Sequence, residues 1–71
     1  MRYLVVIEED PTSFGAYVPD LPGCIAAGEN REEVLRLIHE VLAFHLAGLK
    51  EAGQAIPRPH SSSQFVEVYA A

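Results

Sequence analysis

The chain is poor in the residues on which several common classes of protein depend. It has one cysteine and no tryptophan among its 71 residues, and a single cysteine excludes an internal disulfide. Only five residues are Lys or Arg, against ten Asp or Glu, so the formal net charge is −5 at pH 7. Because binding to a phosphate backbone relies on cationic side chains, this balance argues against direct nucleic-acid binding.

Long apolar runs and familiar catalytic motifs are missing too. The apolar run Leu4–Ile7 is too short to span a membrane, and no basic segment precedes an apolar one as in a secretory signal. With the lone cysteine, these features predict a cytoplasmic protein. The sequence contains no Walker-type loop, dinucleotide fingerprint or Ser-His-Asp set, so we expect neither an enzyme nor a cofactor.

What is present indicates a small folded domain. Hydrophobic residues make up 49% of the chain and the mean hydropathy is +0.12, which is too apolar for a disordered segment. We expect one domain over residues 1–71, without a separate DNA-binding domain. A chain of this size buries only about 60% of its unfolded surface, so self-association into a dimer or tetramer would add useful burial.

Three short strands are expected before a single helix. Arg2–Glu8 and Phe14–Val18 are rich in β-branched and aromatic residues and are predicted to form a hairpin. Pro22 and Gly23 supply the fixed and the permissive φ angle of a type II turn, and a third strand follows over Cys24–Gly28. We assign the turn that specifies the fold to these residues: Asp20, Pro22, Gly23, Cys24 and Gly28.

One long helix should follow, from Arg31 to about Ala52. Asn30 is a good N-cap, and Glu33 three residues later completes a capping box. Gly53 occupies the position of a C′ glycine. After a Pro- and Ser-rich loop, Gln64–Tyr69 alternates as a final strand, which predicts an α+β fold of order β-β-β-α-β with a mainly antiparallel sheet packed on one long helix.

The apolar arc of the helix is wider than one sheet face requires, and we divide it into two stripes. The first is expected to face the sheet and holds Val34, Leu37, Ile38, Val41 and Phe44. The second has heptad-like spacing and is the predicted oligomer interface, with Leu35, Leu42, Leu46 and Leu49.

Candidate catalytic and metal-binding groups have simpler explanations. Consecutive carboxylates at Glu8–Asp10 point to alternate faces of a strand and do not converge. The three histidines, His39, His45 and His60, lack the i, i+4 spacing of helical zinc ligands. Nothing in the sequence near Cys24 supplies a base to activate its thiol. We therefore predict no catalytic residue and no metal site.

The order of motifs resembles the HicB-like antitoxin family. The resemblance rests on Asp20-Leu21-Pro22-Gly23-Cys24, then Gly28, then Arg31-Glu32-Glu33-Val34 at the head of an amphipathic helix. Ala26 and Ala27 stand where that family often has serine or threonine. The resemblance implies a fold similar to a truncated ribonuclease H without the nuclease carboxylates, and self-association into dimers or higher oligomers.

It also implies a function, namely neutralisation of a small basic RNA-cleaving toxin of HicA type. An acidic chain suits such a partner, because complementary charge steers encounter. The alternative is an oligomeric domain that binds a small ligand or an unrelated regulatory protein. In that case the second helix stripe would serve self-association alone. A neighbouring gene for a short basic protein would favour the first interpretation, and its absence the second.

Overall fold

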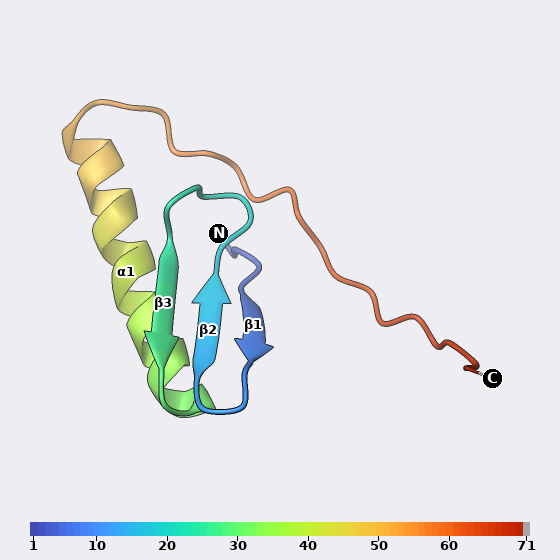
Figure 1. Cartoon of the computed structure of the whole chain (residues 1–71). Coiled ribbons are helices and arrows are strands. Elements are labelled where there is room, and N and C mark those ends of the chain that lie inside the picture. Colours follow the sequence, from blue (N-terminus) through green and yellow to red (C-terminus); the bar gives the residue numbers. More distant parts are fainter. Residues whose placement is uncertain (71) are drawn as a thin grey trace.

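A computed structural model describes residues 1–70 and shows a three-stranded sheet with one long helix packed against it (Figure 1). The strands are β1 (Val6–Glu9), β2 (Phe14–Tyr17) and β3 (Ile25–Gly28), and the helix is α1 (Arg31–Glu51). Both strand pairs are antiparallel and the sheet order is β1-β2-β3. The predicted α+β class and the order of these four elements are confirmed.

The strand register divides the sheet into two faces. Ile7 lies opposite Ala16, and Ala16 lies opposite Ala26, and all three belong to or pack against the buried core. Since successive strand residues point to opposite faces, the residues between them lie on the face that α1 does not cover. One cross-strand row on this open face consists of Val6, Tyr17 and Ile25.

Local capping interactions fix both ends of α1. At the N-terminus, the Glu33 amide donates to Asn30 Oδ1 at 2.8 Å, and the Glu29 amide donates to Glu33 Oε1 at 3.1 Å. The Glu33 side chain thus reaches one residue further back than in the usual capping box. At the C-terminus, Gly53 has φ +70 and its amide donates to Lys50 O, while the amide of Gln54 donates to Leu49 O. These bonds form a Schellman motif.

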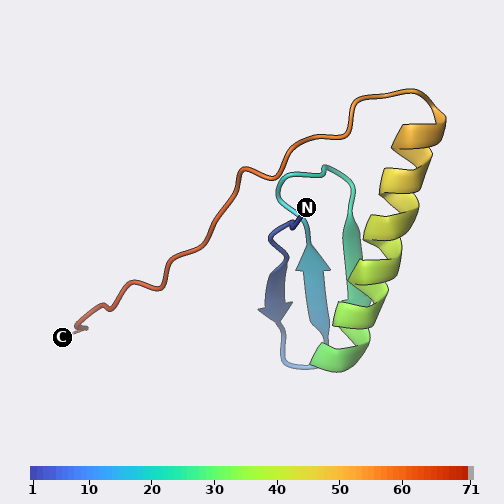
Figure 2. The same cartoon turned by 180° about the vertical axis from the view of Figure 1, so that it is seen from behind.

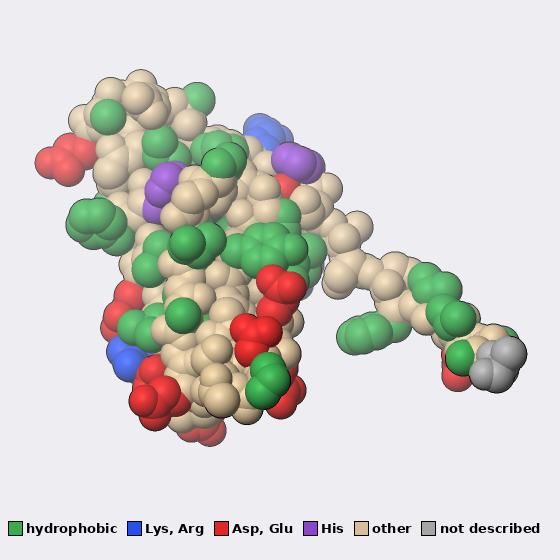
Figure 3. All heavy atoms as spheres, viewed as in Figure 1, with side chains coloured by type: hydrophobic (Ala, Val, Ile, Leu, Met, Phe, Trp, Pro, Cys, Tyr) green, Lys and Arg blue, Asp and Glu red, His purple; other side chains and the backbone are tan. Residues whose placement is uncertain are grey.

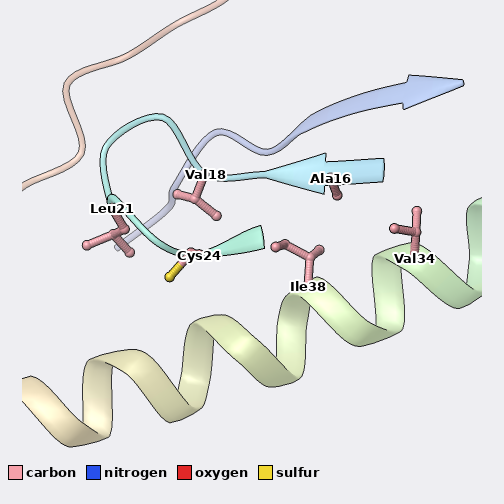
Figure 4. Packing of buried hydrophobic residues seen from close by; sticks show 6 residues of the cluster. All are labelled: Ala16, Val18, Leu21, Cys24, Val34 and Ile38. Atoms are coloured by element: carbon pink, nitrogen blue, oxygen red, sulfur yellow. The ribbon is translucent and has the colours of Figure 1, made fainter. Parts of the chain in front are cut away.

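The core is small and lies between α1, the strands and the loop that joins β2 to β3. Val34 and Ile38 point from the helix toward the sheet, and Leu21 and Cys24 reach the same cluster from the loop (Figure 4). The fully or almost fully buried hydrophobic residues are Ala16, Val18, Leu21, Cys24, Val34 and Ile38. Leu21 and Cys24 extend the core past the ends of the short strands, where it meets the second half of the helix.

The predicted inner stripe of α1 is wrong at Phe44, and Leu37 is half-buried but is not among the described hydrophobic residues that pack against the core. Phe44 is 81% exposed, whereas Leu42 and Leu46, which were placed in the outer stripe, pack against the core. Phe44 follows Ile38 by six residues, so at about 100° per residue it lies about 120° away around the helix. Leu42 follows Ile38 by four residues and lies about 40° from it on the other side, where it packs against the core.

The final strand predicted over residues 64–69 is not a strand in this protomer. After the helix, the chain crosses the end of the sheet and then runs away from the body on the β1 side (Figures 1 and 2). Residues 54–70 contain no regular secondary structure. A strand needs a hydrogen-bonded neighbour, and within residues 1–70 this segment has none.

Candidate protein-binding surface

The loop between β2 and β3 is a compact double turn. The Leu21 amide donates to Val18 O and the Cys24 amide donates to Leu21 O, at 3.1 and 3.2 Å. Gly23 has φ +89, which together with Pro22 one position earlier is the geometry of a type II turn. The Val18 amide donates to Cys24 O and closes the loop at its base. The turn predicted at Pro22-Gly23 is therefore confirmed.

Asp20 lies at the outer end of this loop and holds the segment that follows the helix. Its Oδ2 accepts from the amides of His60 and Ser61 at 2.8 and 3.0 Å, and its Oδ1 accepts from the Ser61 hydroxyl at 2.6 Å. His60 Nε2 also lies 3.1 Å from Oδ1. These bonds, the Ser61 hydroxyl first, lower the pKa of Asp20 to about 2. The ionised carboxylate is thus a fixed acceptor site for residues 40 positions later.

Cys24 has the environment of a packing residue. It is buried as a free thiol, and burial raises its pKa, which disfavours the nucleophilic thiolate. Its neighbours in the core are apolar. Within residues 1–70, no group of three or more His, Cys, Asp or Glu side chains is arranged to hold a metal ion.

Position 28 requires a glycine, because the chain packs closely against the start of the helix there. A Cβ at this position would lie 3.0 Å from Glu33 Oε1 and 3.1 Å from the Val34 backbone nitrogen. The chain passes from β3 into α1 here, so the strand and the first helical turn come very close. Gly28 therefore serves the junction, while Asp20, Gly23 and Cys24 serve the loop at the opposite end of β3.

The open face of the sheet carries an exposed apolar row. Ile25 is 68% exposed and Tyr17 is 38% exposed, although both lie in strands, and Val6 beside them is half-buried. Gly15 and Ala27 form the next row toward the β1–β2 turn, opposite Glu8, so the surface there has small side chains. The sequence alone did not reveal this row, because the strand register that places its three residues side by side is known only from the structure.

Acidic side chains gather at the far end of the sheet from this row, and Glu8 belongs to the row between them. Figure 3 shows most of the acidic side chains over the lower half of the body, around the β1–β2 turn and the start of α1. The sheet topology brings both segments to the same end, because β3 runs back to where β1 ends. The six carboxylates of these segments are Glu8, Glu9, Asp10, Glu29, Glu32 and Glu33, and we call this region the acidic end.

The predicted oligomer stripe on α1 is divided by the packing. Leu42 and Leu46 contact the core of their own protomer, Leu49 is half-buried, and Leu35 is 39% exposed. Leu35 therefore has the most free surface of the four. An oligomer contact through this stripe stays a prediction.

Comparison with known proteins places these features in a family. The profile of the family described as "HicB_like antitoxin of bacterial toxin-antitoxin system" matches residues 3–69. The chain is 35% identical over 69 residues to "Antitoxin HicB 2" of Photorhabdus laumondii, a match that covers 96% of this chain and 50% of that protein.

Two further relatives have less informative names. An uncharacterized 14.9 kDa protein of Haemophilus phage HP1 is 30% identical over 66 residues, covering 93% of this chain and 50% of the phage protein. A UPF0150 protein of Helicobacter pylori is 42% identical over 45 residues, covering 63% of this chain and 62% of that protein. The chain thus spans about half the length of the first two relatives. No solved structure gives a significant match.

Proposed function

The chain belongs to the HicB-like antitoxin family, and we propose that it binds and neutralises a small basic RNA-cleaving toxin of HicA type. The observation that carries this proposal is the family match, which extends over residues 3–69. Its role is to occlude the toxin, and it performs no chemical step itself. The proposed place of action is the cytoplasm, where RNA is the toxin's substrate.

The acidic end and the apolar row on the open face form the proposed toxin-binding surface. Six carboxylates against Arg31 and Arg36 in the same region leave it negative, and a negative patch attracts a basic partner and raises the association rate. The exposed row of Tyr17 and Ile25 supplies apolar area that a partner can bury. Aromatic side chains such as Tyr17 are frequent energetic centres of interfaces.

The fold supports a binding role in a further respect. We propose that the antiparallel sheet and its helix are a shortened ribonuclease H-like unit that lacks the nuclease carboxylates. Glu8 lies on the open face and Glu9 on the opposite face of β1, so these neighbours do not form a paired carboxylate site.

No helix within residues 1–70 is long and apolar enough to cross a membrane.

An inhibition assay tests the function directly. The small basic protein encoded beside this chain is purified, and its cleavage of RNA is measured with increasing amounts of the chain. We expect cleavage to stop near stoichiometric addition and the two proteins to elute together from a sizing column. Full RNA cleavage at a tenfold excess of the chain, with no complex, would remove the proposal and favour binding of a small ligand or another regulator.

A matched pair of charge reversals tests the surface. Glu8→Lys changes the acidic end on the open face, while Glu51→Lys makes the same charge change in the last turn of α1 at the far end of the molecule. We expect Glu8→Lys to slow toxin association by about tenfold at low salt, since rim charges act on association rate. Glu51→Lys should change it much less. Equal effects of the two variants would show that net charge alone, and not this surface, governs binding.

A further inference from the structure

The last residues of the described chain have the composition of a strand and the exposure of a free segment. Residues 62–70 are all exposed, and the four large apolar side chains among them are 76–98% exposed: Phe65, Val66, Val68 and Tyr69. Aromatic and β-branched residues favour strands. Four such residues in six positions are a poor composition for a solvated tail, so this segment has the character of a strand without a sheet.

The body of the protein offers a sheet edge without a strand. Within residues 1–70, β1 is hydrogen-bonded to β2 on one side only, so its outer edge presents amides and carbonyls without a strand partner there. The helix packs against β3 and β2, and the side chains of Tyr3, Val5 and Ile7 on the β1 side are only half-buried. A fourth strand beside β1 would satisfy the edge and cover these side chains.

We call residues 64–70 the tail. The segment just before it, residues 57–63, is fastened close to this edge. Asp20 holds His60 and Ser61, and Tyr3 donates its hydroxyl proton to the carbonyl of Pro57. Ser61–Ser63 and Arg2–Leu4 together line an open hollow at the beginning of β1. From this point, however, the chain diverges from its own β1 and leaves the body, as both views show (Figures 1 and 2).

We propose that Gln64–Tyr69 of one copy adds as a fourth strand to the free β1 edge of a second copy, and that the second copy returns its own tail in the same way. A segment that begins beside an edge and points away from it is placed to pair with a second body. Two-fold exchange satisfies both tails and both edges with two identical, symmetry-related contacts, as closed dimers require. The exchange also adds burial to a domain whose core is small.

The tail carries a single charge, at Glu67. With so little charge, it is better suited to pair with a second copy than to attract a basic toxin. A basic partner is expected to select the acidic end, whereas backbone pairing along a strand edge depends on hydrogen bonds and apolar side chains. The exchanged dimer does not depend on the presence of a toxin. Its failure in the tests below would leave the antitoxin proposal unaffected.

The first test measures molar mass by light scattering for the full chain and two proline variants. Val68→Pro removes an amide and fixes φ in the tail, while Ala55→Pro does so in an exposed loop residue before the tail. We expect a dimer for the wild type and for Ala55→Pro at 100 µM, and a monomer for Val68→Pro with an unchanged helical circular dichroism signal. A monomeric wild type, or a dimeric Val68→Pro variant, would overturn the proposal.

A second test uses the wild-type chain only, so it does not depend on how a variant folds. Isotope-labelled and unlabelled copies are unfolded together and refolded, and nuclear Overhauser effects between differently labelled copies are recorded. We expect such contacts between the tail rings of Phe65 or Tyr69 and the methyl groups of Val5 to Ile7. Contacts found only within one copy would mean that the tail folds back on its own β1, and an absence of contacts would mean that it is free; either result rejects the exchange.

Discussion

Asp20 and Ser61 are joined by two hydrogen bonds across 41 positions of the chain, one to the Ser61 amide at 3.0 Å and one to its hydroxyl at 2.6 Å. The carboxylate thus ties the loop between β2 and β3 to the segment that follows the helix. Asp20 belongs to the motif on which the family resemblance rests. The contact explains why a carboxylate suits this position, because an acceptor-only side chain receives all three donors.

Loss of the Asp20 side chain should release the segment around residue 60. In Asp20→Ala, the amides of His60 and Ser61 lose their acceptor, so we expect their hydrogen exchange to become as fast as that of the exposed tail. Exchange in α1 should change little. Asp10→Ala, in the exposed β1–β2 turn, is the control. Unchanged protection at residues 60 and 61 in Asp20→Ala would show that other contacts hold the segment.

The same carboxylate predicts an acid-dependent stability. The folded pKa of Asp20 is about 2, below its ordinary value of 3.8, so the ionised form favours the folded state. This contribution is complete well above pH 4 and is lost as the pH falls through about 2. We expect the melting temperatures of wild type and Asp20→Asn to converge between about pH 5 and pH 2. A difference that stays constant over this range would contradict the assignment.

Core and surface positions on α1 should respond very differently to truncation. Ile38 is 2% exposed, and replacing it with alanine should cost about 2–5 kcal/mol, because the transfer energy is lost and a cavity remains. Phe44 is mostly exposed, so Phe44→Ala should change stability by no more than about 0.5 kcal/mol. Urea denaturation measures both. A large loss of monomer stability for Phe44→Ala would restore the predicted inner stripe.

Two glycines make a matched test of close packing. In Gly28→Ala, the new Cβ would meet Glu33 Oε1 and the Val34 backbone nitrogen. The Glu33 side chain can move away, but the Val34 backbone cannot. We expect a loss of about 1–3 kcal/mol. Gly48 lies within α1, and a Cβ added there would have no neighbour within 4 Å, so Gly48→Ala should stabilise by about 0.5–1 kcal/mol through helix propensity. Chemical denaturation of both variants checks the opposite signs, and equal signs would refute the packing argument.

Local rules in the sequence predicted the hairpin, the Pro22-Gly23 turn and both ends of the helix. Each of these depends on residues a few positions apart: a fixed φ beside a permissive one, an oxygen three residues from an amide, or a glycine after the last helical turn. The side chain of Glu33 departed from its predicted partner by a single residue. Such features form wherever the local sequence is present, so predicting them needs no knowledge of the fold.

Only the tertiary structure decided which side of the helix is buried and what Asp20 holds. Periodicity gave a wide apolar arc, but the packing of the helix against the core determined that Leu42 and Leu46 are covered while Phe44 stays exposed. Asp20 meets Ser61 because a helix of 21 residues carries the chain back past the loop. The tail has strand-forming residues, but its conformation depends on the edge available to it. Contacts between distant segments are set by how whole elements pack, and no local pattern contains that information.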